Sequence, residues 1–189
     1  MKTIWTSLKR HKSLLLFIFI LFLFGFITGI LFYFKQEASV KETITLSLTN
    51  LFQNNIFTIK NIFYHFVVLI VICSTLFCFV GFPLLVIYIF FEGITIGFIL
   101  PIFFALFKIN AIGYFLLYFV LVKFLFVFLL FLLFVKAFHY LKKYVYCLKR
   151  KSYDFIKNMK YIVVLIFMIL INDLFVYFVS NRILILLLG

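Results

Sequence analysis

The chain has 189 residues, of which 68% are hydrophobic and 23% aromatic, and its 18 Lys and Arg against 5 Asp and Glu give a net charge of +13. This apolar share excludes a water-soluble globular domain and predicts an integral membrane protein. The basic residues lie beside apolar segments, where they determine topology and contact anionic headgroups, so nucleic acid is not the expected partner.

Five apolar segments have about the length that a helix needs to cross the hydrocarbon core, which is roughly 20 residues. They cover residues 13–34, 62–80, 84–107, 112–134 and 161–179. The step Gly81-Phe82-Pro83 should end the second segment, because proline cannot continue the helical hydrogen-bond ladder. Pro101 should kink the third helix or end it early. The apolar tail 183–188 is too short to span the membrane and is expected at an interface.

The segment 35–60, between the first two spans, is predicted to lie outside the bilayer. Its apolar residues recur at helical spacing, although the stretch 43–49 also alternates as a β-strand would. These apolar residues are Val40, Ile44, Leu48, Leu51 and Phe52. We expect an amphipathic helix on the outer surface of the membrane, too small to be a catalytic domain.

Basic residues predict the orientation of the chain. The amino end carries Lys2, Lys9, Arg10 and Lys12 without an acid, and the loop 136–160 carries many more basic residues than acids. Both segments should therefore face the cytoplasm. An odd number of spans satisfies this condition. The sequence thus predicts an all-α, polytopic transmembrane helical bundle that forms a single membrane domain over 1–189, with about five spans and a cytoplasmic amino end.

Three charged residues fall inside predicted spans: Glu92 on the third, Lys123 on the fourth and Asp173 on the fifth. At 1.5 Å per residue, Glu92 lies about 13 Å and Lys123 about 19 Å from the inner ends of their helices, so antiparallel neighbours could bring them together. An unpaired charge near the middle of the membrane costs at least ~3 kcal/mol, so a pair or a partner chain is expected. A fold-holding ion pair, a partner contact and a transport path all remain open.

Two pairs of glycines have the spacing that lets membrane helices approach closely. Gly25 and Gly29 lie on the first span, and Gly93 and Gly97 lie on the third. Each pair predicts a groove for another helix, either within the fold or in a dimer. The spacing does not fix the oligomeric state.

Sequence motifs for catalysis or cofactor binding are absent, including GxxxxGK[ST], GxGxxG, GxSxG and HExxH. The three cysteines form no CxxC pattern, and the histidines are not spaced as metal ligands. The histidines lie near predicted membrane boundaries, where interfacial or solvated positions are expected: His11, His65 and His139. We predict a non-enzymatic protein with no cofactor and no bound metal.

The block VGFPLLVIYIFFEGITIGFIL at 80–100 resembles the pattern G-hydrophobic-P, an apolar run, FF-x-G-xxx-GF of the stage II sporulation protein M family of bacterial membrane proteins. The sequence GFxxGI at 25–30, Asn61 at the start of the second span and NDLFVYFVSN around Asp173 are also similar to the family. The resemblance runs over most of the chain, and the block at 81–98 is its specific part.

The chain departs from the family pattern at two positions. The family commonly has a basic residue where Glu92 stands, and a Pro-Gln-Asn-like step where this chain has Lys123-Phe124-Leu125. An acid gained on one helix and a base gained on the next look like an internal compensation.

The resemblance implies a multi-pass scaffold in the bacterial inner membrane, with membrane-anchored murein hydrolases as partners. In sporulating members, the complex unites a lytic transglycosylase and a peptidoglycan amidase/endopeptidase at the engulfing septal membrane. The alternative is a permease-like subunit of a transporter, in which Glu92, Lys123 and Asp173 line a path and a cytoplasmic ATPase docks on the basic loop. The fourth span carries Lys123 alone amid apolar residues, which favours the scaffold.

Overall fold

The computed structural model describes residues 12–54, 59–76, 81–147, 155–180 and 182. Over these residues the chain is helical and contains no strand, which confirms the predicted all-α class. The predicted interfacial tail 183–188 and His11 lie outside the described residues.

Three helical stretches are long and apolar enough to cross a membrane: Lys12–Phe34, Gly81–His139 and Tyr161–Val179. The middle stretch has 59 residues, which as one straight helix would measure about 88 Å. That is far more than the hydrocarbon core of a bilayer, about 30 Å thick. The stretch instead turns back on itself near its middle. Large apolar side chains are exposed on these helices, as expected where lipid replaces water as the solvent.

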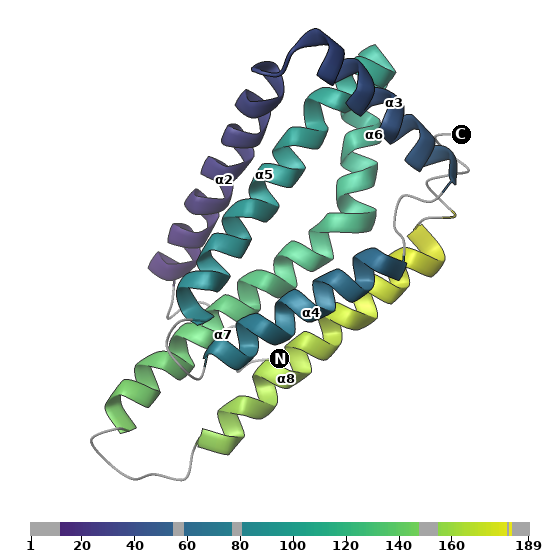
Figure 1. Cartoon of the computed structure of the whole chain (residues 1–189). Coiled ribbons are helices and arrows are strands. Elements are labelled where there is room, and N and C mark those ends of the chain that lie inside the picture. Colours follow the sequence, from purple (N-terminus) through teal and green to yellow (C-terminus); the bar gives the residue numbers. More distant parts are fainter. Residues whose placement is uncertain (1–11, 55–58, 77–80, 148–154, 181, 183–189) are drawn as a thin grey trace.

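The reversal occurs after α5 (Gly81–Phe107), at the short 3₁₀ turn η1 (Lys108–Asn110). Lys108 has φ of 47°, in the left-handed region, and this conformation redirects the chain. The return leg consists of α6 (Ala111–Tyr118), the π-helical segment η2 (Phe119–Phe124) and α7 (Leu125–Cys147). Figure 1 shows this leg returning beside α5, and both α6 and α7 contact α5.

Helices α2 (Lys12–Phe34) and α5 form the most extensive helix pair and run parallel, as Figure 1 shows. Gly25 faces Gly93, and Gly29 faces the backbone of Ile94 one turn further along. A Cβ atom added to Gly25 would lie 3.3 Å from the Cα atom of Gly93. At Gly97 an added Cβ atom would clash with the backbone of Phe26. The glycines therefore meet within the fold and let the two backbones touch.

The remaining helices complete the bundle. Helix α4 (Ile59–Leu76) packs against α5 and α8 (Phe155–Phe175), and α8 also packs along α7. Helix α8 continues into a second π-helical segment, η3 (Val176–Ser180), which contacts η2. Apolar side chains from α2, α4, α5, α7 and α8 form the main buried core.

The segment after α2 forms helix α3 (Ala38–Asn54), which Figure 1 shows crossing over the end of α5. The helix agrees with the spacing of its apolar residues and not with the strand-like alternation over 43–49. Side-chain hydroxyls on this helix donate hydrogen bonds to the preceding turn. Thr43 bonds to the carbonyl of Ser39 at 2.9 Å, and Ser47 bonds to that of Thr43 at 2.8 Å. These bonds satisfy the hydroxyls within the helix.

Both prolines lie within α5, Pro83 at its start and Pro101 in its interior. Helix α5 begins at Gly81, so Pro83 lies in its first turn, where the missing N–H removes no helical hydrogen bond. Pro101 lies inside α5, and the helix continues through it to Phe107. Its ring removes the bond to the Gly97 carbonyl, and packing against neighbouring helices holds the remaining turns together.

Helix α7 extends well beyond the predicted end of the fourth span at 134. It continues to Cys147, and α8 begins at Phe155, so much of the predicted basic loop 136–160 is helical. The continuation is held by packing, because Val135 and Ala137 are buried. Lys136 lies on the same turn, with its ammonium 5.1 Å from the ring centroid of Tyr161 on α8. Basic residues here lie along helices rather than in an irregular connection.

Candidate functional site

Glu92 and Lys123 form a buried ion pair between α5 and the return leg. The Lys123 ammonium donates a hydrogen bond to Oε2 of Glu92 at 3.0 Å. Glu92 is 7% exposed and Lys123 is 8% exposed. Because α5 and the return leg are antiparallel neighbours, the two residues meet despite being 31 positions apart. A buried charge whose partner is removed is strongly destabilising. Each of the two side chains therefore compensates the buried charge of the other.

Lys123 belongs to the π-helical segment η2, in which Val122 is also buried. A π-helical turn is wider than an α-helical turn and is uncommon except as a short insertion, frequently at functional sites. In η2 two consecutive side chains, Val122 and Lys123, are buried. The second π-helical segment, η3, begins three residues after Asp173 and contacts η2. Helical irregularity is thus concentrated beside the buried charges.

A second polar contact joins α4 to α8. His65 Nδ1 lies 3.4 Å from Asp173 Oδ2, and the two side chains are 13% and 3% exposed. Although the atoms are close, Asp173 Oδ2 makes no hydrogen bond to the described residues. The contact is therefore looser than the Glu92–Lys123 pair, and an attraction between full charges requires that His65 be protonated.

Phe126 connects the two contacts. Its ring stacks on the His65 ring with centroids 5.1 Å apart and planes 27° apart. The Lys123 ammonium lies 5.4 Å from the centroid of the same ring, within the range of a cation–π interaction. We call Glu92, Lys123, His65 and Asp173 the charge cluster; four helical segments contribute to it.

Two other buried polar atoms lie on the same helices. The Tyr88 hydroxyl lies one turn before Glu92 on α5 and has no hydrogen-bond partner among the described residues. Asn172, next to Asp173, is also buried, and its Nδ2 atom has no hydrogen-bond partner among the described residues. An unpaired buried polar group costs about 1–3 kcal/mol, so each of these atoms lowers the stability of the bundle.

The structure divides the three predicted intramembrane charges between two contacts. It brings Glu92 to Lys123, and it places Asp173 against His65, a residue expected at an interface or in solvent. The sequence feature that could have identified His65 is its position inside the predicted second span. It lies three residues inside the predicted second span, and Asp173 lies six residues before the end of the predicted fifth span. Both are therefore at similar depth below the same predicted face.

The other predicted site residues have packing roles. Gly25, Gly29, Gly93 and Gly97 line the contact between α2 and α5. Gly81 is buried at the start of α5, and Pro83, in the same turn, is exposed. His139 is exposed on α7.

The charge cluster links four helical segments through two polar contacts, Glu92–Lys123 and His65–Asp173. Within the described ranges, no three His, Cys, Asp or Glu side chains are grouped to hold a metal ion. Glu92 and Lys123 engage each other, which leaves neither placed as a free nucleophile or base.

Comparison with known proteins finds no significant match: no protein-family model, no curated protein and no solved structure is similar to the chain. The function is therefore inferred from the residues of the chain itself.

Proposed function

We propose that the chain is a multi-pass protein of the bacterial inner membrane, with five spans and its amino end in the cytoplasm. The spans are α2, α4, α5, the leg from α6 to α7, and α8. This topology requires the first and third spans to run in the same direction, and the parallel pair α2 and α5 agrees with it. The basic amino end and the basic residues after position 135 then lie on the cytoplasmic side.

Within the membrane we propose that the chain acts as a non-enzymatic scaffold for a peptidoglycan-remodelling complex of the sporulation or engulfment type. Its partners would be membrane-anchored murein hydrolases. The identity of the complex rests on the resemblance of the block at 80–100 to the stage II sporulation protein M family.

The observation that best supports a scaffold is the internal pairing of the buried charges. Glu92 and Lys123 neutralise each other at 3.0 Å and pack among apolar side chains. A transport path would need polar groups that stay accessible to a substrate along the membrane. A bundle whose charges are paired with each other can instead present a fixed, apolar outer surface to partner helices.

Affinity purification after cross-linking in native membranes tests the scaffold. The wild-type chain should enrich identified peptidoglycan-cleaving enzymes over unrelated membrane proteins. The double variant Glu92→Gln/Lys123→Met keeps an uncharged pair of similar size, so it should enrich the same enzymes. Absence of wall enzymes from the wild-type sample would contradict the scaffold.

The second candidate is a permease-like subunit, and the two adjoining π-helical segments favour it. Such segments are often found where helices bind substrates or rearrange. In that case the wild-type chain should co-purify with a cytoplasmic ATPase, and the double variant should fold normally but fail to support growth on the transported substrate. Retained growth support in the double variant would exclude a transport role for the pair.

A further inference from the structure

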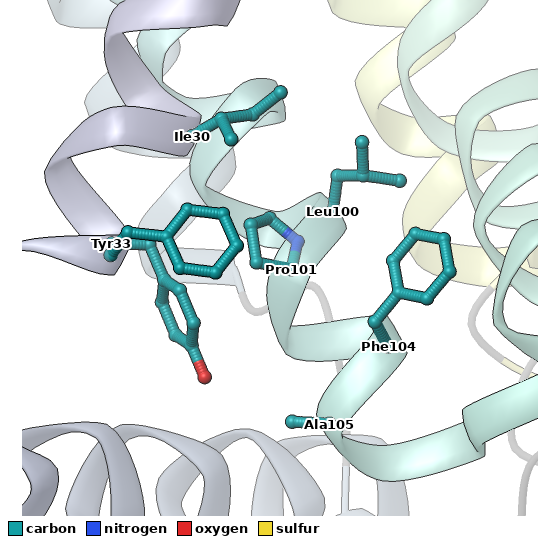
Figure 2. Close-up of a pocket in the computed structure, with 7 residues that line it drawn as sticks. Ile30, Tyr33, Leu100, Pro101, Phe104 and Ala105 are labelled. Carbon is teal, nitrogen blue, oxygen red and sulfur yellow. The ribbon is translucent and has the colours of Figure 1, made fainter.

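A groove opens between α2 and α5 beyond the point where their glycines touch. It has a volume of about 440 Å³ and is lined by apolar and aromatic side chains, among them Tyr33 and Phe34 of α2 and Pro101, Phe104 and Ala105 of α5. Figure 2 shows Ile30 and Tyr33 on the α2 side of the groove and Leu100, Pro101, Phe104 and Ala105 on the α5 side. Large side chains at 33 and 34 follow Gly29, the last glycine of α2 in the close contact.

A cation lies at one end of this groove. The Lys41 ammonium, from α3, donates a hydrogen bond to the Phe34 carbonyl at 3.0 Å and lies 5.7 Å from the centroid of the Tyr33 ring. Among the described residues no carboxylate lies within ion-pair distance of it. An ammonium has three N–H donors, and the Phe34 carbonyl uses one. Two donors thus remain for an anion.

We propose that this groove binds one anionic phospholipid of the surrounding leaflet, with an acyl chain along Tyr33, Pro101 and Ala105 and the phosphate at Lys41. Glu37 and Glu42 lie close to Lys41 in the sequence, and their carboxylates disfavour further anions nearby. The site therefore takes a single phosphate held close to the ammonium rather than a broad anionic surface. The site follows from membrane insertion and does not depend on the proposed scaffold function.

Lys41 also has a structural role, since a cation near the final carbonyls of α2 stabilises that helix end. That role explains the bond to Phe34 but not the adjoining apolar groove. A second groove serves as a comparison. It lies between α4 and α5, has a volume of about 280 Å³, and has an uncharged lining that includes Val67, Val71 and Phe91. An acyl chain alone would bind both grooves, whereas a phosphate selects the groove beside Lys41.

Native mass spectrometry of the full chain, released from bilayers of equal phosphatidylglycerol and phosphatidylcholine, tests the site. The wild-type chain should retain phosphatidylglycerol preferentially. Lys41→Gln should lower this preference about fivefold, the effect of one basic residue on an anionic lipid, and Lys41→Arg should keep it. Ala105→Trp fills the groove from an exposed position, so retention of phosphatidylglycerol should fall even though Lys41 is intact.

Two control variants separate this site from general effects. Lys35→Gln removes an exposed lysine at the same end of α2, and Val71→Trp changes the second groove. Both should retain the lipid as the wild type does. The proposal is overturned if Lys35→Gln loses as much as Lys41→Gln, if the wild type retains both lipids equally, or if Ala105→Trp has no effect. It is also overturned if the groove holds a second copy of the chain, seen as a dimer that Ala105→Trp dissociates.

Discussion

Glu92 and Lys123 face each other across two antiparallel helical segments, and each is less than one tenth exposed. The hydrogen bond between them satisfies one donor of the ammonium and one oxygen of the carboxylate. In water such a pair contributes little, but inside the bundle the loss of one partner leaves an uncompensated charge. The consequence at the residue scale is that the two positions should tolerate joint replacement better than single replacement.

A double-mutant cycle tests this coupling. Glu92→Gln and Lys123→Met should each lower the stability of the folded chain in detergent by about 3–5 kcal/mol, because each leaves one buried charge unpaired. The double variant should recover most of that loss. The measurement is the fraction of monodisperse chain after a heating series. Additive losses in the double variant would show that the side chains do not interact.

His65 shows why residue pairing was only partly predictable. Unlike Glu92 and Lys123, it does not interrupt the middle of an apolar run, so composition alone places it at a boundary. Its contact with Asp173 depends on α4 lying beside α8, an adjacency that hydropathy does not encode. Depth along each helix can be counted from sequence, but the neighbours of each helix follow from packing.

At the element scale, the contact between α2 and α5 depends on the absence of side chains. Both helices contribute two glycines one turn apart, and backbone atoms of one helix occupy the space beside the glycines of the other. The GxxxG spacing was visible in the sequence, but it does not indicate which helix is the partner.

The helical nature of 38–54 could be predicted from the spacing of its apolar residues. The extension of α7 past 134 could not, because its basic residues resemble those of a cytoplasmic loop.

Glycine substitutions test the close contact. Gly97→Val should force α2 and α5 apart, because its side chain would meet the backbone of Phe26, and the yield of folded chain should fall severely. Gly113→Ala is the matched control, since nothing lies within 4 Å of an added Cβ atom there. Its helical position predicts a gain of roughly 0.5–1 kcal/mol in stability. A similar folded yield for Gly97→Val and the wild type would rule out the glycine contact.

At the scale of the whole molecule, apolar helices surround an interior that holds two acids, a lysine and a histidine. Charge is distributed unevenly along the sequence: the basic residues gather at the amino end and after position 135, and the segment 35–60 carries both signs. The all-α class was predictable from the sequence, whereas the orientation of the basic segments stays a prediction. The packing order of the helices required the structure, since apolar composition does not indicate which helices are neighbours.

The central claim is that the chain is a five-span membrane bundle with both basic segments in the cytoplasm, and cysteine labelling tests it most directly. In a background without Cys73, Cys78 and Cys147, single cysteines are placed at Thr49 on α3 and at Ser152, which lies outside the described residues. A membrane-impermeant maleimide added to intact cells should label the Thr49→Cys chain, and should label the Ser152→Cys chain only after permeabilisation. Labelling of Ser152→Cys in intact cells, alone or together with Thr49→Cys, would contradict the account.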